Sequence, residues 1–257
     1  MDRGDEMNKT ALVTGASRGI GRAIAERLAA DGALVAVHYG TNKAAALETV
    51  AAIEAAGGNA FLVEADLARP DGVGLLIDGL VEGLAGRPLD VLVNNAAVFG
   101  PGIDATEDEF DRVFRVNVRA PFFLIQKALP LLGDGGRIIN ISSGVTWFAI
   151  PEAVYAMTKG ALNALGRSLA NTLGDRGITV NTVSPGITRS DMNTWLDDVP
   201  GATEGVTRIV ALGRVGEAAD IADAVAFFTT PDSRWVTGQV LDVTGGLYLG
   251  PRAPLHH

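Results

Sequence analysis

The chain has 257 residues, of which 47% are hydrophobic, and a formal net charge of −9. This length and apolar content suffice to bury a large core. The acidity argues against the concentrated basic surface that nucleic-acid binding needs, so we expect no nucleic-acid partner. The absence of cysteine excludes disulfides, cysteine nucleophiles and thiolate metal sites.

The distribution of apolar residues bears on location. The longest apolar runs, such as residues 120–128, are broken by polar residues too early for a membrane span. Residues 1–9 are polar and lead directly into a strand-like run, without the apolar stretch of a signal peptide. We therefore expect a soluble, cytoplasmic protein that has no membrane partner.

Short β-branched runs alternate with longer helical patterns along the whole chain. The predicted strands are residues 10–14, 34–38, 60–64, 89–94, 137–142, 178–183 and 239–243. The predicted helices are 20–31, 43–56, 70–84, 106–132 (in one or two pieces, with a break near Pro121), 152–173 and 218–229. This alternation predicts an α/β fold: a doubly wound, mainly parallel seven-stranded sheet of Rossmann type with helices on both faces. No linker or repeat divides the chain, so residues 1–257 are predicted to form a single domain.

A glycine-rich turn follows the first predicted strand. Residues 14–21 read T-G-A-S-R-G-I-G and lie between a strand and a helix. Glycines there let the backbone approach a ligand, and the helix amino terminus offers N–H groups to a pyrophosphate. The spacing matches neither G-x-G-x-x-G nor a Walker P-loop. A turn without a ligand is the alternative, and three glycines at this place favour a bound dinucleotide.

Tyr155 and Lys159 are four residues apart in a predicted helix and therefore lie on one face of it. A nearby ammonium favours tyrosinate and lowers the pKa of the phenol toward the range in which it can transfer a proton near neutral pH. Taken alone, the pair is more typical of a solvated helical face. A catalytic role requires a cofactor and a third polar group from the rest of the chain.

These two patterns resemble the short-chain dehydrogenase/reductase family, which carries T-G-x-x-x-G-x-G and Y-x-x-x-K. Further motifs follow in the family's order: N-N-A-A at 94–97, Asn117, I-S-S at 141–143, P-G at 185–186, R-x-G at 214–216, and T-G at 237–238 with G-G at 245–246. The resemblance covers about residues 9–248 and is closest to the 3-oxoacyl-carrier-protein reductase-like branch. Ala97, Ser190 and Thr244 stand where this pattern often has Gly, Thr and Asp, and none of the three removes a catalytic group.

The resemblance implies a catalytic tetrad of Ser143, Tyr155, Lys159 and Asn117. Tyr155 would be the general acid in reduction and the base in oxidation, while Lys159 would lower its pKa and bind the nicotinamide ribose. Ser143 would hydrogen-bond the carbonyl oxygen, and Asn117 would hold a water that links Lys159 to solvent. Ser142 is the alternative to Ser143. Either serine could instead cap local backbone, and Asn117 could bond a neighbouring turn.

The end of the second predicted strand bears on the choice of cofactor. NAD-binding sheets of this type usually carry an acidic residue there, which bonds the ribose 2′-hydroxyl. Tyr39 takes that place here, and no carboxylate stands beside it. Arg18, together with Thr41, Asn42 or Lys43, could bind a 2′-phosphate. We therefore predict NADP(H) rather than NAD(H).

The resemblance also places Asp66 on the adenine, although an aspartate there could instead cap a helix. The full set of predicted cofactor contacts is Gly15, Ser17, Arg18, Gly19, Ile20, Gly21, Tyr39, Thr41, Asn42, Asp66, Leu67, Asn94, Ala96, Tyr155, Lys159, Pro185, Gly186, Ile187 and Ser190. No metal site is predicted, because the histidines at positions 38, 256 and 257 lack metal-ligand spacing and are expected at the surface or in the tail.

Substrate choice is expected to come from residues 145–151 and from a lid at about 190–212, the least regular part of the chain. The side chains that could form an apolar wall, or could be ordinary packing, are Trp147, Phe148, Ile150, Met192 and Trp195. Delivery of the substrate by a carrier protein would need basic residues near the entrance, for which the candidates are Lys127, Arg137 and Arg176.

Together these patterns predict an NADP(H)-dependent oxidoreductase that acts on a small-molecule carbonyl or secondary alcohol. The alternatives are an NAD-dependent alcohol dehydrogenase and a dinucleotide-binding sensor or scaffold without turnover. The complete tetrad favours an enzyme. The resemblance further implies a homotetramer or homodimer, packed through the predicted helices at 104–132 and 152–173, which carry many small residues.

Overall fold

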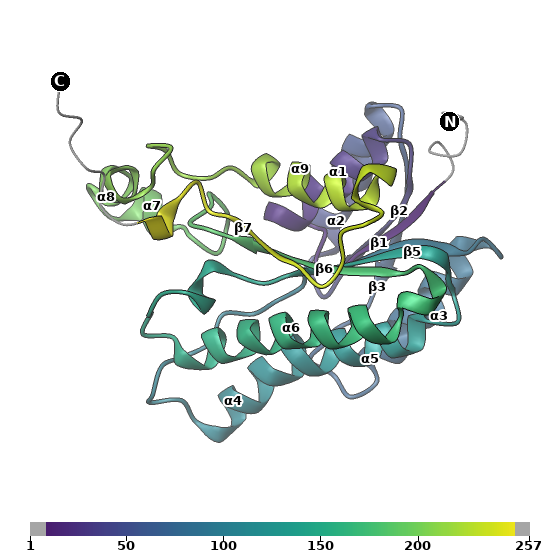
Figure 1. Cartoon of the computed structure of the whole chain (residues 1–257), viewed down its shortest axis with the longest axis horizontal. Coiled ribbons are helices and arrows are strands. Elements are labelled where there is room, and N and C mark those ends of the chain that lie inside the picture. Colours follow the sequence, from purple (N-terminus) through teal and green to yellow (C-terminus); the bar gives the residue numbers. More distant parts are fainter. Residues whose placement is uncertain (1–8, 250–257) are drawn as a thin grey trace.

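A parallel sheet forms the centre of the computed structural model, which describes residues 9–249 (Figure 1). Its strands are β1 (Thr10–Val13), β2 (Leu34–Tyr39), β3 (Asn59–Glu64), β4 (Leu89–Asn94), β5 (Leu132–Ile141), β6 (Thr179–Pro185) and β7 (Val240–Val243). They lie in the order β3-β2-β1-β4-β5-β6-β7, and every neighbouring pair is parallel. The predicted seven-stranded α/β fold is thus confirmed. The predictions for residues 1–8 and for His256 and His257 lie outside the described residues.

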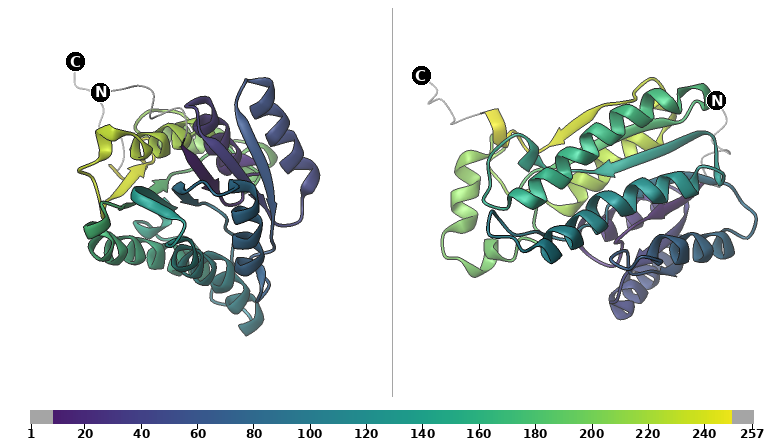
Figure 2. Two further views of the ribbon diagram at one scale, coloured as in Figure 1. Left: turned by 90° about the vertical axis from the view of Figure 1, so that its right-hand side faces the viewer. Right: turned by 90° about the horizontal axis from the view of Figure 1, so that it is seen from below.

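Helices cover both faces of the sheet (Figures 1 and 2). Their bounds are α1 (Gly19–Ala30), α2 (Lys43–Ala55), α3 (Gly72–Leu84), α4 (Glu107–Phe114), α5 (Ala120–Ala128), α6 (Ala153–Thr172), α7 (Trp195–Asp198), α8 (Ala202–Ile209) and α9 (Ala218–Thr229). One face carries α1, α2 and α9, and the other carries α3, α5 and α6.

The strands are apolar on both sides, which explains why the sheet is covered twice. Leu12 and Val13 are neighbours in β1 and fully buried, yet they belong to different cores. Val13 packs in the cluster that contains Ile24 of α1, whereas Leu12 packs in the cluster that contains Leu124 of α5. Successive side chains of a strand point to opposite faces, so a continuous apolar run serves two layers. Burial of each such side chain contributes about 1.5–3 kcal/mol to the free energy that stabilises the folded state.

The region between α4 and β5 differs from the sequence prediction. The predicted helix at 106–132 ends at Ala128, and a π-helical turn, Arg115–Arg119, separates α4 from α5. Pro121 lies in the first turn of α5, where its missing N–H costs no helical bond, so it does not break the helix. β5 begins at Leu132 rather than 137, because it pairs with Leu89 before a register shift, despite the loop-like G-D-G-G sequence at 133–136.

The order of the strands places a crevice above the centre of the sheet. From β1 the sheet extends to β2 and β3 on one side and to β4 on the other, so the connections reverse direction between β1 and β4. In open α/β sheets, ligands bind at such a switch point, beyond the carboxyl ends of the strands. Within residues 9–249, no helix combines the length and the apolarity that crossing a membrane requires.

Candidate active site

The glycine-rich turn leaves β1 and enters α1 in a backbone conformation that needs glycine. Gly15 and Gly19 have φ of +64° and +55°, in the left-handed region that glycine adopts most readily. Gly21 is required for space, since a Cβ there would lie 2.2 Å from the carbonyl oxygen of Gly15 and 2.4 Å from Nδ2 of Asn95. That Nδ2 donates to the carbonyl oxygen of Thr14 at 2.8 Å and so fixes the turn from the side of β4.

The amino terminus of α1 opens toward the same space. Its N-cap residue, Arg18, makes no side-chain capping bond, so the N-cap side chain does not satisfy the first N–H groups of the helix. Such N–H groups, with the positive end of the helix dipole, suit a phosphate. The Arg18 guanidinium is 67% exposed and lies 3.4 Å from the carboxylate of Asp191, which is 58% exposed. This exposed pair is weak and leaves Arg18 available to an anion.

A cleft of about 1240 Å³ lies above the carboxyl ends of the strands. Its size exceeds the ~300–1,000 Å³ of an ordinary small-molecule pocket, which suits a cofactor together with a substrate. The predicted cofactor residues that line it are Gly15, Ser17, Arg18, Gly19, Ile20, Gly21, Thr41, Asn42, Asp66, Leu67, Ala96, Tyr155, Lys159, Pro185, Gly186, Ile187 and Ser190. Ser143 lines it as well. Among the described residues, no cluster of potential metal ligands occurs.

Tyr39 and Asn94, two predicted cofactor contacts, lie outside this cleft. Tyr39 is buried in the core against α1 and α2, and its hydroxyl donates to Oε2 of Glu64 at 2.7 Å. Asn94 is buried on the other face of the sheet, where its Nδ2 donates to Oδ1 of Asn140 at 2.9 Å. In both cases the neighbouring residue in the chain, His38 or Asn95, lines the cleft instead.

His38 is not the surface residue that the sequence predicted, because it is only 2% exposed. His38 lies in a strand that helices cover on both faces. The place of this strand in a parallel sheet is the feature from which its burial could have been predicted. Its Nδ1 accepts the N–H of Gly15 at 3.0 Å, and its Nε2 lies 2.9 Å from the carbonyl oxygen of Ala65. Burial lowers the pKa of His38 to about 4, so the ring is neutral near pH 7.

The first residues of α6 bring the predicted catalytic groups together. Tyr155 is 6% exposed and its hydroxyl is hydrogen-bonded to Ser143, which lies at the end of β5. Ser142 has a different partner, since its Oγ donates to the backbone carbonyl of Lys159 at 3.1 Å. The geometry therefore favours Ser143 over Ser142 as the serine that faces a substrate beside Tyr155.

Lys159 lies beside Tyr155, with its Nζ 5.5 Å from the centroid of the tyrosine ring. The ammonium donates to the carbonyl oxygen of Ile141 at 2.8 Å, and burial lowers its pKa to about 7. The pKa of Tyr155 is raised to about 12 by burial, against the opposing effect of the Ser143 hydrogen bond. The sequence predicted the opposite direction for Tyr155, because it could show the nearby lysine but not the depth of burial.

Asn117 lies in the π-helical turn, outside the residues that line the cleft. Its Oδ1 accepts the N–H of Val98 at 2.9 Å, and its Nδ2 donates to the Val98 carbonyl and to Oγ1 of Thr158. The side-chain amide thus holds the loop after β4 to α6.

Asp66 follows β3 and lines the cleft, but it does not cap a helix. Its Oδ1 accepts the N–H of Ala68 at 2.9 Å in a local turn, while the N-cap of α3 is Asp71. The aspartate therefore shapes the loop at the cleft edge. Asn42 combines two tasks, because it lines the cleft and its Oδ1 also accepts the N–H of Ala45 as the N-cap of α2.

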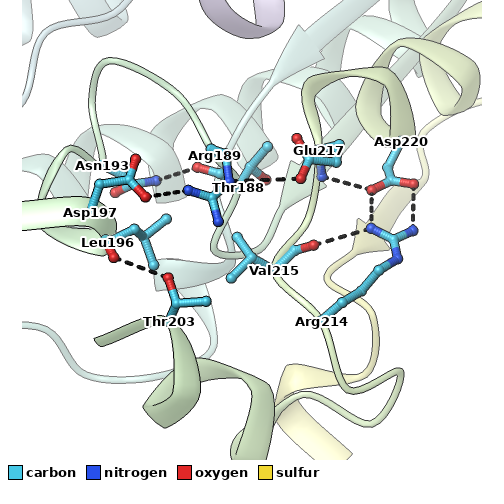
Figure 3. Close-up of polar contacts among 10 residues, drawn as sticks. All are labelled: Thr188, Arg189, Asn193, Leu196, Asp197, Thr203, Arg214, Val215, Glu217 and Asp220. Atoms are coloured by element: carbon cyan, nitrogen blue, oxygen red, sulfur yellow. Dashed lines mark hydrogen bonds and ion pairs between the residues drawn. The ribbon is translucent and has the colours of Figure 1, made fainter. Parts of the chain in front are cut away.

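The predicted lid at 190–212 contains two short helices, α7 and α8, and is fastened at its base by ion pairs (Figure 3). Arg189 pairs with Asp197 of α7 and lies 3.8 Å from the carboxylate of Glu217, which precedes α9. Arg214 binds Asp220 through both of its terminal nitrogens, at 2.6 and 2.7 Å. A small apolar core of its own supports the lid; its buried members are Leu196, Val206, Val210 and Val215.

The half of the cleft beside Tyr155 is largely apolar. The Phe99 ring, which sequence analysis missed, is tilted against the Tyr155 ring with centroids 4.8 Å apart. Four of the five side chains predicted to form an apolar wall line the cleft, namely Phe148, Ile150, Met192 and Trp195. Trp147 is not among the lining residues and is 60% exposed.

The three basic residues considered for carrier-protein delivery lie near the amino ends of the strands, opposite the cleft. Arg137 pairs with Thr179 at the start of β6, and Arg176 precedes that strand and binds Asp134. Lys127 is in the last turn of α5, which leads into the amino end of β5. The cleft opens at the carboxyl ends of the strands, so none of these cations flanks its entrance.

Comparison with known proteins yields close relatives over nearly the whole chain. The family pattern described as "Enoyl-(Acyl carrier protein) reductase" matches residues 15–248. The promiscuous reductase LugOII, which catalyses keto-reduction at C1 during lugdunomycin biosynthesis, is 52% identical, with 95% of this chain and 100% of that chain covered and a TM-score of 0.90. The angucycline C-6 ketoreductase LanV with bound NADP is 48% identical, with 95% and 98% covered and a TM-score of 0.90.

A third relative is the 3-oxoacyl-[acyl-carrier-protein] reductase FabG of Staphylococcus aureus. It is 41% identical over 249 residues, which cover 95% of this chain and 100% of the relative. Identity at this level over the full length extends well beyond the fold alone. The chain therefore belongs to the short-chain dehydrogenase/reductase family, in its 3-oxoacyl-carrier-protein reductase-like branch.

Proposed function

We propose that this protein reduces a ketone to a secondary alcohol with NADPH, using Tyr155 as the general acid. The observation that carries the proposal is that Tyr155 and Ser143, whose hydroxyls interact with each other, both line the cleft. Two hydroxyls that meet in this way can both donate to one carbonyl oxygen. The keto-reduction by LugOII and the NADP bound to LanV support the same class of reaction.

Each polar group would have a separate task. Ser143 and Tyr155 would hold the carbonyl oxygen, and Tyr155 would transfer its phenolic proton to that oxygen as negative charge develops there. Lys159, 5.5 Å from the centre of the tyrosine ring, would stabilise the tyrosinate that remains. Asn117, whose side chain is bonded to Val98 and Thr158, would hold a water that links Lys159 to solvent for proton resupply.

The protonation state of Tyr155 matches the form that a general acid needs. With a pKa raised to about 12 by burial, the phenol carries its proton throughout the neutral range and is ready to donate it. Lys159, with its pKa lowered to about 7 by burial, carries its charge in only part of the molecules at neutral pH.

The residues around the cleft fit NADPH, which supplies the hydride for the carbonyl carbon when bound. The closely packed Gly15 and Gly21, and the uncapped first turn of α1, suit the pyrophosphate. Arg18 and Thr41 would bind the 2′-phosphate, because both line the cleft and no acidic residue occupies positions 40–42 after β2. Lys159 would bind the nicotinamide ribose and Asp66 the adenine.

The cleft walls favour an apolar, ring-bearing ketone over an acyl chain presented by a carrier protein. Phe99 lies directly against Tyr155, and Phe148 and Trp195 provide further aromatic surface for a flat apolar substrate. The cations considered for a carrier protein lie near the amino ends of the strands, away from the cleft. Association into a homodimer or homotetramer stays a prediction; exposed Phe122 on α5 and Met157 on α6 offer apolar contacts for it.

The alternative is a dinucleotide-binding sensor or scaffold without turnover. Such a protein has no need of a phenol bonded to a second hydroxyl at the cleft wall, so the Tyr155–Ser143 pair argues against it. Cofactor oxidation in the presence of a ketone separates the two functions directly.

Turnover with both cofactors tests the proposal. Purified protein is mixed with NADPH or NADH and with a panel of aliphatic and aryl ketones, and loss of the reduced cofactor is followed by absorbance. We expect turnover with aryl ketones and a Kd for NADPH at least about tenfold below that for NADH, which is the effect of one charge-assisted contact to the 2′-phosphate. Tighter binding of NADH would refute the assignment of Arg18, and binding without any turnover would favour the sensor.

A further inference from the structure

His38 joins two segments of the cleft that the proposed cofactor would have to contact together. Gly15 belongs to the glycine-rich turn after β1, and Ala65 immediately precedes Asp66 in the loop after β3. The imidazole lies between them, with Nδ1 3.0 Å from the N–H of Gly15 and Nε2 2.9 Å from the carbonyl oxygen of Ala65. One side chain on β2 therefore sets the spacing of loops that leave the two neighbouring strands.

The chemistry of these partners permits only one form of the ring. The backbone N–H of Gly15 can only donate, so Nδ1 must carry a lone pair. The carbonyl of Ala65 can only accept, so Nε2 must carry the proton. Both bonds exist only in this neutral tautomer, and the deep burial of His38 keeps the ring neutral near pH 7. A charged imidazole would place two N–H groups against each other at Gly15.

We propose that His38 is a cofactor-positioning residue, which holds the glycine-rich turn (residues 14–21) and the adenine-side loop (residues 65–68) at the spacing that one dinucleotide bridges. The inference rests on the proposed binding of NADPH. Residues of both segments line the cleft. The turn contributes Gly15, Ser17 and Gly19, and the loop contributes Ala65, Asp66, Leu67 and Ala68. The role of His38 is in binding, and it has no part in the proton transfer at Tyr155.

Three substitutions separate the effects of the two hydrogen bonds that the His38 ring makes. His38→Asn keeps an acceptor near the position of Nδ1, His38→Gln keeps a donor near the position of Nε2, and His38→Leu removes both. Loss of a buried hydrogen bond that leaves its partner unsatisfied corresponds to about tenfold in affinity. We expect the Kd for NADPH to rise about tenfold or more in His38→Leu and by less in His38→Asn, while kcat at saturating NADPH and the KM for the ketone stay at wild-type values.

The control is Val37→Ala, one residue earlier on the same strand. Val37 is fully buried but faces the opposite layer and does not line the cleft, so its substitution should lower the Tm and leave the Kd for NADPH unchanged. Binding is measured by fluorescence titration, without reliance on turnover. If the wild type fails to bind NADPH, the proposed function fails. If it binds and all three His38 variants bind equally well, or if Val37→Ala weakens binding to the same extent, the positioning role is wrong.

Discussion

Replacement of Tyr155 by phenylalanine should lower kcat for ketone reduction by about 10²–10⁴-fold, the contribution typical of a positioned general acid. The ring would keep its packing against Phe99, whose centroid is 4.8 Å away, and only the hydroxyl bonded to Ser143 would be lost. Cofactor affinity and the Tm should therefore stay close to wild-type values. Steady-state kinetics with NADPH and an aryl ketone, together with an NADPH titration, measure both quantities.

Tyr39→Phe provides a matched control for this experiment. It removes the same atom from another buried tyrosine, whose hydroxyl bonds Glu64 outside the cleft. We expect full activity from Tyr39→Phe. Comparable kcat values for Tyr155→Phe and the wild type would show that another group donates the proton.

The second large effect is expected from Gly21→Ala. The new methyl group would lie 2.2 Å from the carbonyl oxygen of Gly15 and 2.4 Å from Nδ2 of Asn95. The first atom belongs to the backbone, and the second is held by its hydrogen bond to the carbonyl oxygen of Thr14. The turn would have to move, which disturbs both the core beneath it and the N–H groups that face the cleft. We expect a loss of about 1–3 kcal/mol in the free energy of unfolding, as for other overpacked sites. The Kd for NADPH should rise more than tenfold, which is the change in affinity that a free-energy loss of this size produces.

Gly74→Ala in α3 is the control for this substitution. Gly74 is also helical, but a Cβ there would meet no atom within 4 Å, so alanine should stabilise the helix by a few tenths to about 1 kcal/mol. Chemical denaturation and NADPH titration of the two variants test the difference. Unchanged cofactor binding by Gly21→Ala would remove the glycine-rich turn from the cofactor site.

The fold and the core of the site could be predicted because their signals are local in the sequence. The glycine-rich turn needs its glycines within a few residues, and one helical turn brings Tyr155 and Lys159 to the same face. Two of the predicted contacts lie next to the residues that line the cleft. Side chains alternate along a strand, so at the ends of β2 and β4 it is His38 and Asn95 that line the cleft, while the adjacent Tyr39 and Asn94 are buried elsewhere.

Other properties of the site depend on contacts between distant parts of the chain. The side-chain amide of Asn117 is used by Val98 and Thr158, which are 19 and 41 residues away. The pKa of Tyr155 depends on how deeply the surrounding loops bury it, and burial raises it although the sequence shows a lysine four residues away. A sequence pattern can identify which groups react, but it cannot supply the packing that sets their protonation.

The most direct test of the proposed function is product analysis with an aryl ketone that also carries a conjugated carbon–carbon double bond. Because we propose that the Tyr155 and Ser143 hydroxyls hold and protonate an oxygen, we expect the unsaturated secondary alcohol, formed in the same amount as the NADPH consumed. The saturated ketone, which is the product expected of an enoyl reductase, would contradict it.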